Sequence, residues 1–268
     1  MSTAVQQPDH AAAVAAQSAR FVDLVRGADL TLPVPTCPGW TLGDLVRHCG
    51  GVHRWFSALL LQRVQERPAG RDIDLRLPES DEGYPDWLAA GAEAAAEVFA
   101  GLDPDAPMWV WGADAHARFW IRRMLFETLV HRVDAERTLG LPSAIEPPLA
   151  RDGVDEFLTN LPFATPFAPG VARLRGADRT IRFRCADTDG SWLVRLRPDG
   201  FGLVADEADE ADEAGGAGGS TGAADATVLA PAADLLLVLY GRTARTAPGV
   251  ETAGDAELLD LWFTNSAF

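Results

Sequence analysis

Residues 126–137 read FETLVHRVDAER, and this stretch decides which fold and which kind of site the chain can form. Leu129, Val130 and Val133 spread apolar side chains around most of a helix, which is typical of the central helix of a bundle. Glu127 and His131 lie four residues apart, so on a helix their side chains stack on one stripe and can hold a common ion. Such pairs also occur on solvated helix faces without an ion, and the spacing alone leaves both interpretations open.

A further histidine, His48, lies on a separate amphipathic segment. Within residues 41–65 apolar side chains recur at helical spacing, and His48 falls inside that apolar seam. Burying the Glu127 carboxylate without a partner would cost several kcal/mol, and a metal shared by His48, Glu127 and His131 removes that cost. Two histidines and one carboxylate also leave coordination positions open for water or substrate. For His48 alone, a hydrogen-bonded core histidine remains the alternative.

The composition limits the classes of protein and of reaction mechanism to which this chain can belong. The chain has 268 residues, of which 47% are hydrophobic and eight are tryptophan, so it is expected to fold into one large or two ordinary domains. The net charge of −16 argues against nucleic acid as a partner. All 23 basic residues are arginine, which excludes Schiff-base and P-loop mechanisms that depend on lysine.

The sequence also indicates the cellular compartment and whether the chain is expected to meet a membrane. No run of 18 apolar residues occurs, so no membrane-spanning helix and no membrane partner are expected. Residues 1–10 lack the basic and apolar regions of a signal peptide. The three cysteines are odd in number and form no Cys-x-x-Cys pattern, which favours reduced thiols in a cytoplasmic protein.

Apolar periodicity and helix-end signals predict an α+β protein that begins with an up-and-down four-helix bundle. Thr41, with Asp44 at the third helical position, forms a capping-box variant, and Gly140 is placed to end the last helix of the bundle. The expected helices cover residues 11–26, 41–66, 85–102 and 113–139. Together they make a metal-binding domain of residues 1–146.

Residues 147–268 are expected to form a small α+β domain with an antiparallel sheet. Period-two alternation predicts strands, and a strongly apolar segment predicts a helix near the C-terminus. The expected elements are a helix at 152–161, strands at 180–185, 191–197, 201–204 and 227–229, a helix at 232–241 and a closing element at 258–263. Residues 205–225 are acidic and then rich in glycine, which indicates a mobile loop.

Three segments of this sequence look familiar in combination. Residues 34–41 read VPTCPGWT, residues 44–48 read DLVRH, and FETLVHRVDAE follows at 126–136. They resemble the mycothiol-dependent maleylpyruvate isomerase family, within the DinB/YfiT-like metalloprotein superfamily. Residues 233–242, ADLLLVLYGR, resemble the second domain of that family, so the resemblance covers both expected domains.

The resemblance implies a DinB-like bundle that binds Zn²⁺ or another divalent metal through His48, Glu127 and His131. It also implies an actinobacterial cytoplasmic enzyme that uses mycothiol as thiol co-substrate. Metal coordination lowers the pKa of a thiol from about 8.5, and the thiolate can then add to a small electrophile. Addition followed by reversal makes an isomerase, whereas retained addition makes an S-transferase. The oligomeric state is expected to be monomer or homodimer.

Four further side chains have two interpretations each. Arg242 is the candidate catalytic and cofactor-binding residue, since an arginine suits a substrate carboxylate, but it also suits a helix C-terminus. Trp40 can line the cofactor pocket or fix the entry of the following helix. Asp134 can orient an imidazole or pair with a nearby arginine. His53 lies about 140° around the helix from His48, so it is expected at the surface or behind the ligands.

Two non-enzymatic functions remain open from the sequence. The protein could be a non-catalytic metal-containing binding or stress protein. It could also be a regulatory protein associated with sigma factors, for which the acidic residues 206–213 would suit a basic partner. An intact set of three metal ligands and a candidate substrate-binding arginine favour the enzyme.

Overall fold

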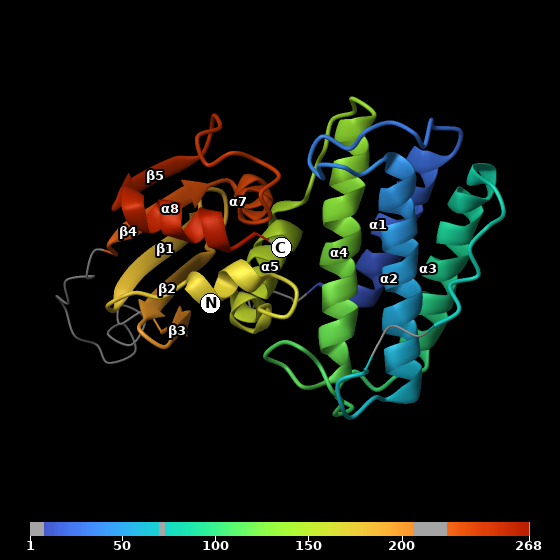
Figure 1. Cartoon of the computed structure of the whole chain (residues 1–268), viewed down its shortest axis with the longest axis horizontal. Helices are drawn as coiled ribbons and strands as arrows, with labels where there is room; N and C mark the ends of the chain where they lie inside the picture. The colour runs from blue at the N-terminus through green and yellow to red at the C-terminus, as the bar shows by residue number, and fades with distance from the viewer. Residues whose placement is uncertain (1–7, 70–72, 206–223, 268) are drawn as a thin grey trace, which may run out of the picture. The chain divides into compact units, whose positions relative to one another are not determined.

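The computed structural model describes residues 8–69, 73–205 and 224–267, and it divides into two compact units (Figure 1). The first unit runs from Met1 to Ser143 and the second from Ala144 to Phe268. The first is a helical bundle and the second contains a five-stranded sheet, which confirms the expected α+β class. No helix among the described residues is both long enough and apolar enough to cross a membrane.

The four long helices of the first unit all lie where the periodicity predicts them. Helices α1 and α2 each pack against both α3 and α4, so the four enclose one core. A short 3-10 turn, Asp81–Gly83, precedes α3. The helices are α1 (His10–Val25), α2 (Leu42–Gln62), α3 (Tyr84–Ala100) and α4 (Ala117–Thr138).

The ends of these helices follow their capping chemistry. The Thr41 side chain accepts from the Asp44 backbone N–H, and the Asp44 side chain accepts from the Thr41 backbone N–H, so the expected capping box starts α2. Gly140 has φ of +68°, the left-handed conformation that ends helices and that residues with a Cβ rarely adopt. These local signals set where α2 begins and where α4 ends.

Helix α4 is the central element, as its apolar circumference predicts. Its buried residues include not only Leu129 and Val133 but also charged side chains. Arg132 and Glu136 are each 1% exposed and form an ion pair of 2.6 Å. Arg20 of α1 also pairs with Glu136, so the two helices are joined by a buried ionic contact. Charges are buried on this helix only with partners.

The second unit is built around a mixed sheet with strand order β3-β2-β1-β4-β5. Strands β1, β2 and β3 form the expected antiparallel meander, but β4 pairs parallel to β1. Helices α7 and α8 both contact β1 and β4, and α5 packs against α7. The strands are β1 (Arg179–Cys185), β2 (Ser191–Arg197), β3 (Gly200–Val204), β4 (Ala226–Ala230) and β5 (Glu251–Gly254). The helices are α5 (Pro147–Asn160), α7 (Ala232–Leu239), α8 (Ala256–Asn265) and the 3-10 turns Leu161–Phe163 and Pro169–Arg173.

Three details of this unit differ from the sequence-based expectation. Helix α5 begins at Pro147 rather than at 152, because proline is well accommodated in the first turn, where its missing N–H is not needed. Strand β5 was not expected, and its four residues are all exposed, so they carry no apolar alternation. The sheet is not wholly antiparallel, because β4 returns beside β1. Most of the expected loop at 205–225, including its acidic part, lies outside the described residues.

Candidate metal site

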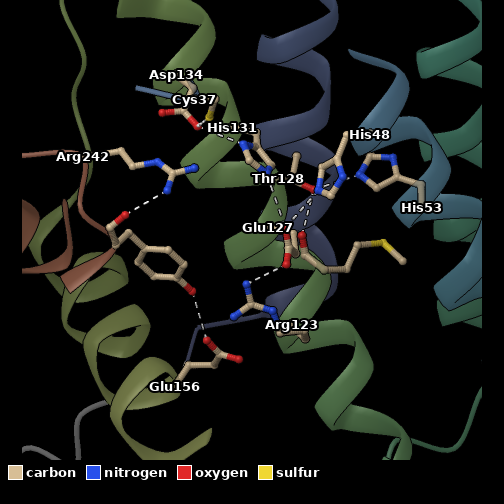
Figure 2. Close-up of polar contacts among 12 residues, drawn as sticks. Cys37, His48, His53, Arg123, Glu127, Thr128, His131, Asp134, Glu156 and Arg242 are labelled. Carbon is tan, nitrogen blue, oxygen red and sulfur yellow. Dashed lines mark hydrogen bonds and ion pairs between the residues drawn. The ribbon is translucent and has the colours of Figure 1, made fainter. Parts of the chain in front are cut away.

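The three candidate ligands converge from two helices of the bundle (Figure 2). His48 comes from α2, while Glu127 and His131 come from one stripe of α4. Nε2 of His48 and Nε2 of His131 each lie 3.5 Å from Oε2 of Glu127. The two imidazole rings have centroids 4.8 Å apart at an angle of 82°. The ring nitrogens and the carboxylate oxygen therefore face one common point.

The spacing of these atoms suits a metal ion. One ligand atom from each of His48, Glu127 and His131 lies within 4.8 Å of the others. Two ligand atoms bound to zinc at about 2.1 Å in tetrahedral geometry are separated by roughly 3.4 Å. The 3.5 Å separations match this value. The donor set of two imidazoles and one carboxylate is also one that divalent metals use, so the residues fit the expected group.

Glu127 has a fixed charged partner on the side away from the histidines. Arg123, one helical turn earlier and only 2% exposed, donates from Nη2 to Oε1 of Glu127 at 2.9 Å. Burial alone would raise the pKa of Glu127. The charge of Arg123 and hydrogen bonds from both histidines outweigh burial and hold that pKa well below its usual range. The carboxylate is therefore ionised, and its Oε2 faces the histidines.

His131 has a carboxylate behind it. Its Nδ1 lies 2.9 Å from Oδ2 of Asp134, which is completely buried. Burial lowers the pKa of His131, but Asp134, Cys37 and Glu127 together raise it to about 10. Asp134 therefore contacts the imidazole, as in the first of the two roles considered from the sequence. Cys37, Asp134 and His131 also form another set with metal-ligand spacing.

The segment before α2 supplies an aromatic wall. Trp40 stacks on the His131 ring, with centroids 6.1 Å apart at 24°, and is tilted against His48 at 5.1 Å. Backbone hydrogen bonds from Trp40 N to Cys37 O and from Val34 N to Trp40 O fold the segment into tight turns. Gly39 has φ of +85° within them. Trp40 thus covers both histidine rings, as expected for a pocket-lining residue, while its contact with a cofactor stays a prediction.

His53 is not at the surface, which was one of its two expected positions. It is completely buried, and its Nε2 lies 2.8 Å from the Thr128 hydroxyl, which donates to the Met124 carbonyl. Burial, together with the charge of Arg54, lowers the pKa of His53 to about 4. The sequence did not reveal this interior position, because the apolar face of α2 extends further around the helix than the seam that contains His48.

Arg242 lies just after α7 in the second unit, following the Gly241 turn. Its Nη1 donates to the Tyr240 carbonyl at 2.8 Å, and the Tyr240 hydroxyl donates to Glu156 at 3.4 Å. The first contact satisfies a carbonyl at the end of α7, which is the helix-end role considered from the sequence. Its role toward a substrate stays a prediction.

Sequence reasoning missed three side chains that support the candidate ligands. They are Arg123, Thr36 and Cys37. The spacing of Arg123 four residues before Glu127 was a usable signal. The contacts of Thr36 and Cys37 with Asp134 join residues 98 and 97 positions apart, respectively, which no local pattern reports.

Comparison with known families covers nearly the whole chain. Residues 11–136 match the model described as "Mycothiol maleylpyruvate isomerase N-terminal domain". Residues 148–261 match "MDMPI C-terminal domain", the second domain of the same family. The chain belongs to the mycothiol-dependent maleylpyruvate isomerase family. The resemblance seen in the sequence is thereby confirmed.

Solved structures agree on the fold. The crystal structure of the mycothiol-dependent maleylpyruvate isomerase superimposes with a TM-score of 0.60 at 11% identity, covering 95% of this chain and 98% of that one. A histidine-to-alanine mutant of that enzyme gives the same TM-score and coverage at 10% identity. No curated protein is similar enough to match. At these identities the structures establish a shared fold, and activity must be argued from the site.

Proposed function

We propose that this member of the maleylpyruvate isomerase family is a divalent-metal-dependent isomerase or S-transferase. It would use mycothiol as the thiol and a small electrophile as the substrate. The observation that carries the proposal is the convergence of His48 and His131 on one oxygen of Glu127, each at 3.5 Å. Three protein ligands leave at least one coordination position for an incoming group, which is typical of a catalytic rather than a structural site.

The residues around the site set its charge. Glu127 and Asp134 each contribute one negative charge and Arg123 one positive charge, so the three together carry a net charge of −1. A divalent ion held there would supply a Lewis acid that favours one thiolate at neutral pH. Trp40 contacts both imidazole rings. This charge balance favours thiol addition over binding of a neutral ligand.

Hydrolysis is the competing chemistry for the same donors. It would ideally use a separate general base beside a metal-bound water. In this chain Glu127 is one of the three candidate ligands, and Asp134 accepts from His131, Thr36 and Cys37. Neither carboxylate near the centre is therefore arranged as that base, which supports the thiol-dependent reaction.

Arg242 is the proposed substrate-binding residue. Its guanidinium offers a planar fork of donors that matches a carboxylate, and one Nη donates to Tyr240. An Arg242→Ala substitution should mainly raise KM for a carboxylate electrophile while leaving metal content unchanged. Unchanged kinetics would reduce Arg242 to the helix-end role.

The proposed setting is the cytoplasm of a mycothiol-producing actinobacterium, where the protein would act as a monomer or homodimer. Cys37, Cys49 and Cys185 form no disulfide in the described part of the chain. A non-catalytic metal-binding or sigma-factor-associated role is the alternative. It predicts that the metal-loaded protein converts no electrophile, with or without thiol.

The decisive screen follows both the conversion of the electrophile and the consumption of thiol by the zinc-loaded full-length protein, because an isomerase returns the thiol unchanged whereas an S-transferase consumes it. The electrophiles should include cis-alkene carboxylates such as maleylpyruvate, each tested with and without mycothiol. We expect turnover only when zinc and mycothiol are both present, with loss in His131→Ala and retention in His116→Ala. Turnover of an ester or amide without thiol would overturn the proposed reaction.

A further inference from the structure

The loop that precedes α2 reaches the side of α4 that lies behind His131. The hydroxyl of Thr36 donates to Oδ1 of Asp134 at 2.6 Å, and the thiol of Cys37 donates to Oδ2 at 3.4 Å. Nδ1 of His131 lies 2.9 Å from the same Oδ2 (Figure 2). Asp134 is completely buried, and its two oxygens together receive these three donors.

These contacts distinguish the two nitrogens of His131. Nδ1 faces Asp134, while Nε2 faces Oε2 of Glu127 at 3.5 Å. The Asp134 oxygens accept from Thr36 and Cys37, so the carboxylate acts here as an acceptor, and the nitrogen 2.9 Å from Oδ2 is placed to donate its proton to it. A neutral imidazole with its proton on Nδ1 has its lone pair on Nε2, and that is the nitrogen directed at the candidate metal position.

We infer that Asp134 is a positioning residue, held in place by Thr36 and Cys37, which keeps the proton of His131 on Nδ1 and so makes Nε2 the metal-binding nitrogen. The inference rests on the proposed metal site and identifies a residue that holds one of its ligands in place. Carboxylates behind metal-binding histidines fix the ring orientation and raise the basicity of the ligand nitrogen.

The same inference gives the loop at residues 34–40 a defined function. Its turns, closed by hydrogen bonds from Cys37 N to Val34 O and from Trp40 N to Cys37 O, place three side chains around one imidazole. Thr36 and Cys37 fix the carboxylate behind His131, while Trp40 stacks on the ring itself. The loop therefore supports the site from outside without supplying any of its three ligands.

A second metal site is the competing interpretation of the same residues. Cys37, Asp134 and His131 each offer one ligand atom within 4.8 Å of the others. An ion held by these three residues would break the contact between Asp134 and Nδ1 of His131. The His131 ring would then have to bind two cations, one through each nitrogen. The hydrogen bonds already account for how the thiol, the carboxylate and Nδ1 are arranged, which favours a hydrogen-bonded support.

The test measures zinc affinity and stoichiometry on the full-length protein. Asp134→Leu removes both acceptor oxygens while keeping the branched shape of the side chain, Asp134→Asn keeps one acceptor, and Thr36→Val removes one donor. We expect one zinc per chain throughout, with Kd raised about 10- to 100-fold in Asp134→Leu and less in the two conservative variants. Asp23→Asn, on the exposed side of α1, controls for the loss of a negative charge and should leave Kd unchanged.

Nitrogen-15 NMR of histidine-labelled, zinc-loaded protein supplies a readout that fold stability does not move. The Nδ1–H signal of His131 should be present in wild type and in Asp134→Asn, and lost or shifted in Asp134→Leu. If Asp134→Leu does not fold, Asp134→Asn and Thr36→Val still decide the question through their affinities.

The failures of the two proposals are distinguishable. A wild-type protein that binds no zinc overturns the metal site itself. Zinc binding by wild type with equal Kd in the folded Asp134 variants and in Thr36→Val overturns the positioning role alone. Two zinc ions per chain, falling to one in Cys37→Ser, would replace the inferred support by a second metal site.

Discussion

Arg123 donates to Oε1 of Glu127 at 2.9 Å, and this contact leaves Oε2 of the same carboxylate to face His48 and His131. The arginine is 2% exposed and the glutamate side chain 22%, so the pair lies largely out of water. An arginine thus fixes the direction of the carboxylate that the site needs.

Replacing Arg123 by methionine should destabilise the metal-free protein by about 3 kcal/mol, because a mostly buried carboxylate loses its charged partner. The free energy of unfolding from urea titration measures this effect. Adding Glu127→Gln to Arg123→Met should recover much of the loss, whereas Arg26→Met, at an exposed ion pair, should change stability little. An Arg123→Met protein as stable as wild type would remove the ion pair from this account.

Zinc binding should release protons from His131. Because Asp134, Cys37 and Glu127 raise the pKa of His131 to about 10 against the effect of burial, the metal-free ring carries protons on both nitrogens at pH 8. Metal binding displaces the proton on Nε2, so about one proton should be released from this residue. Calorimetry in buffers of different ionisation enthalpy measures that number. Equal heats in all buffers would contradict the protonation state assigned to His131.

The buried His53 should lower the stability of the folded protein in mild acid. Burial lowers its pKa from 6.5 to about 4, so between these values the unfolded chain binds a proton that the folded chain does not. Stability contributed by neutral His53 is therefore present above pH 6.5 and falls as the pH drops toward 4, by up to about 3 kcal/mol. His53→Gln keeps a hydrogen-bonding group beside Thr128 without titrating there. Its unfolding free energy should depend less steeply on pH in this window, and equal slopes would contradict the assignment.

Local chemistry explains why much of the bundle was predictable. The Thr41–Asp44 capping box and the left-handed Gly140 act within a few residues, and the structure has both where the sequence places them. The i, i+4 spacing of Glu127 and His131 likewise fixes their shared stripe on α4. These features need no knowledge of tertiary packing.

Long-range contacts explain what the sequence did not reveal. The hydrogen bonds of Thr36 and Cys37 to Asp134 depend on how the loop before α2 meets α4. The parallel pairing of β4 with β1 depends on a chain return that strand periodicity does not specify. Strand β5 has four exposed residues and so lacks the alternation by which strands are recognised.

The adjacent glycines of α2 should respond oppositely to alanine. A Cβ on Gly50 would collide with the ring of Trp87, whose indole N–H donates to the Leu75 carbonyl and holds the ring in place. Gly50→Ala should therefore cost about 1–3 kcal/mol. Gly51 has only a Leu75 methyl at 3.9 Å, so Gly51→Ala should be neutral or stabilising by up to about 1 kcal/mol. Thermal denaturation of both variants measures the difference, and equal melting temperatures would contradict the packing of α2 on α3.

The central claim is that His48, Glu127 and His131 hold one divalent metal. It is tested most directly by the metal content of the purified full-length protein after zinc loading and extensive dialysis. We predict about one zinc per chain in wild type, because three convergent ligands bind tightly, and loss of tight binding in His131→Ala, because two ligands rarely hold zinc against water. His116→Ala, at the N-terminus of α4 and outside the three ligands, should keep its zinc. Full zinc occupancy in His131→Ala would contradict the account.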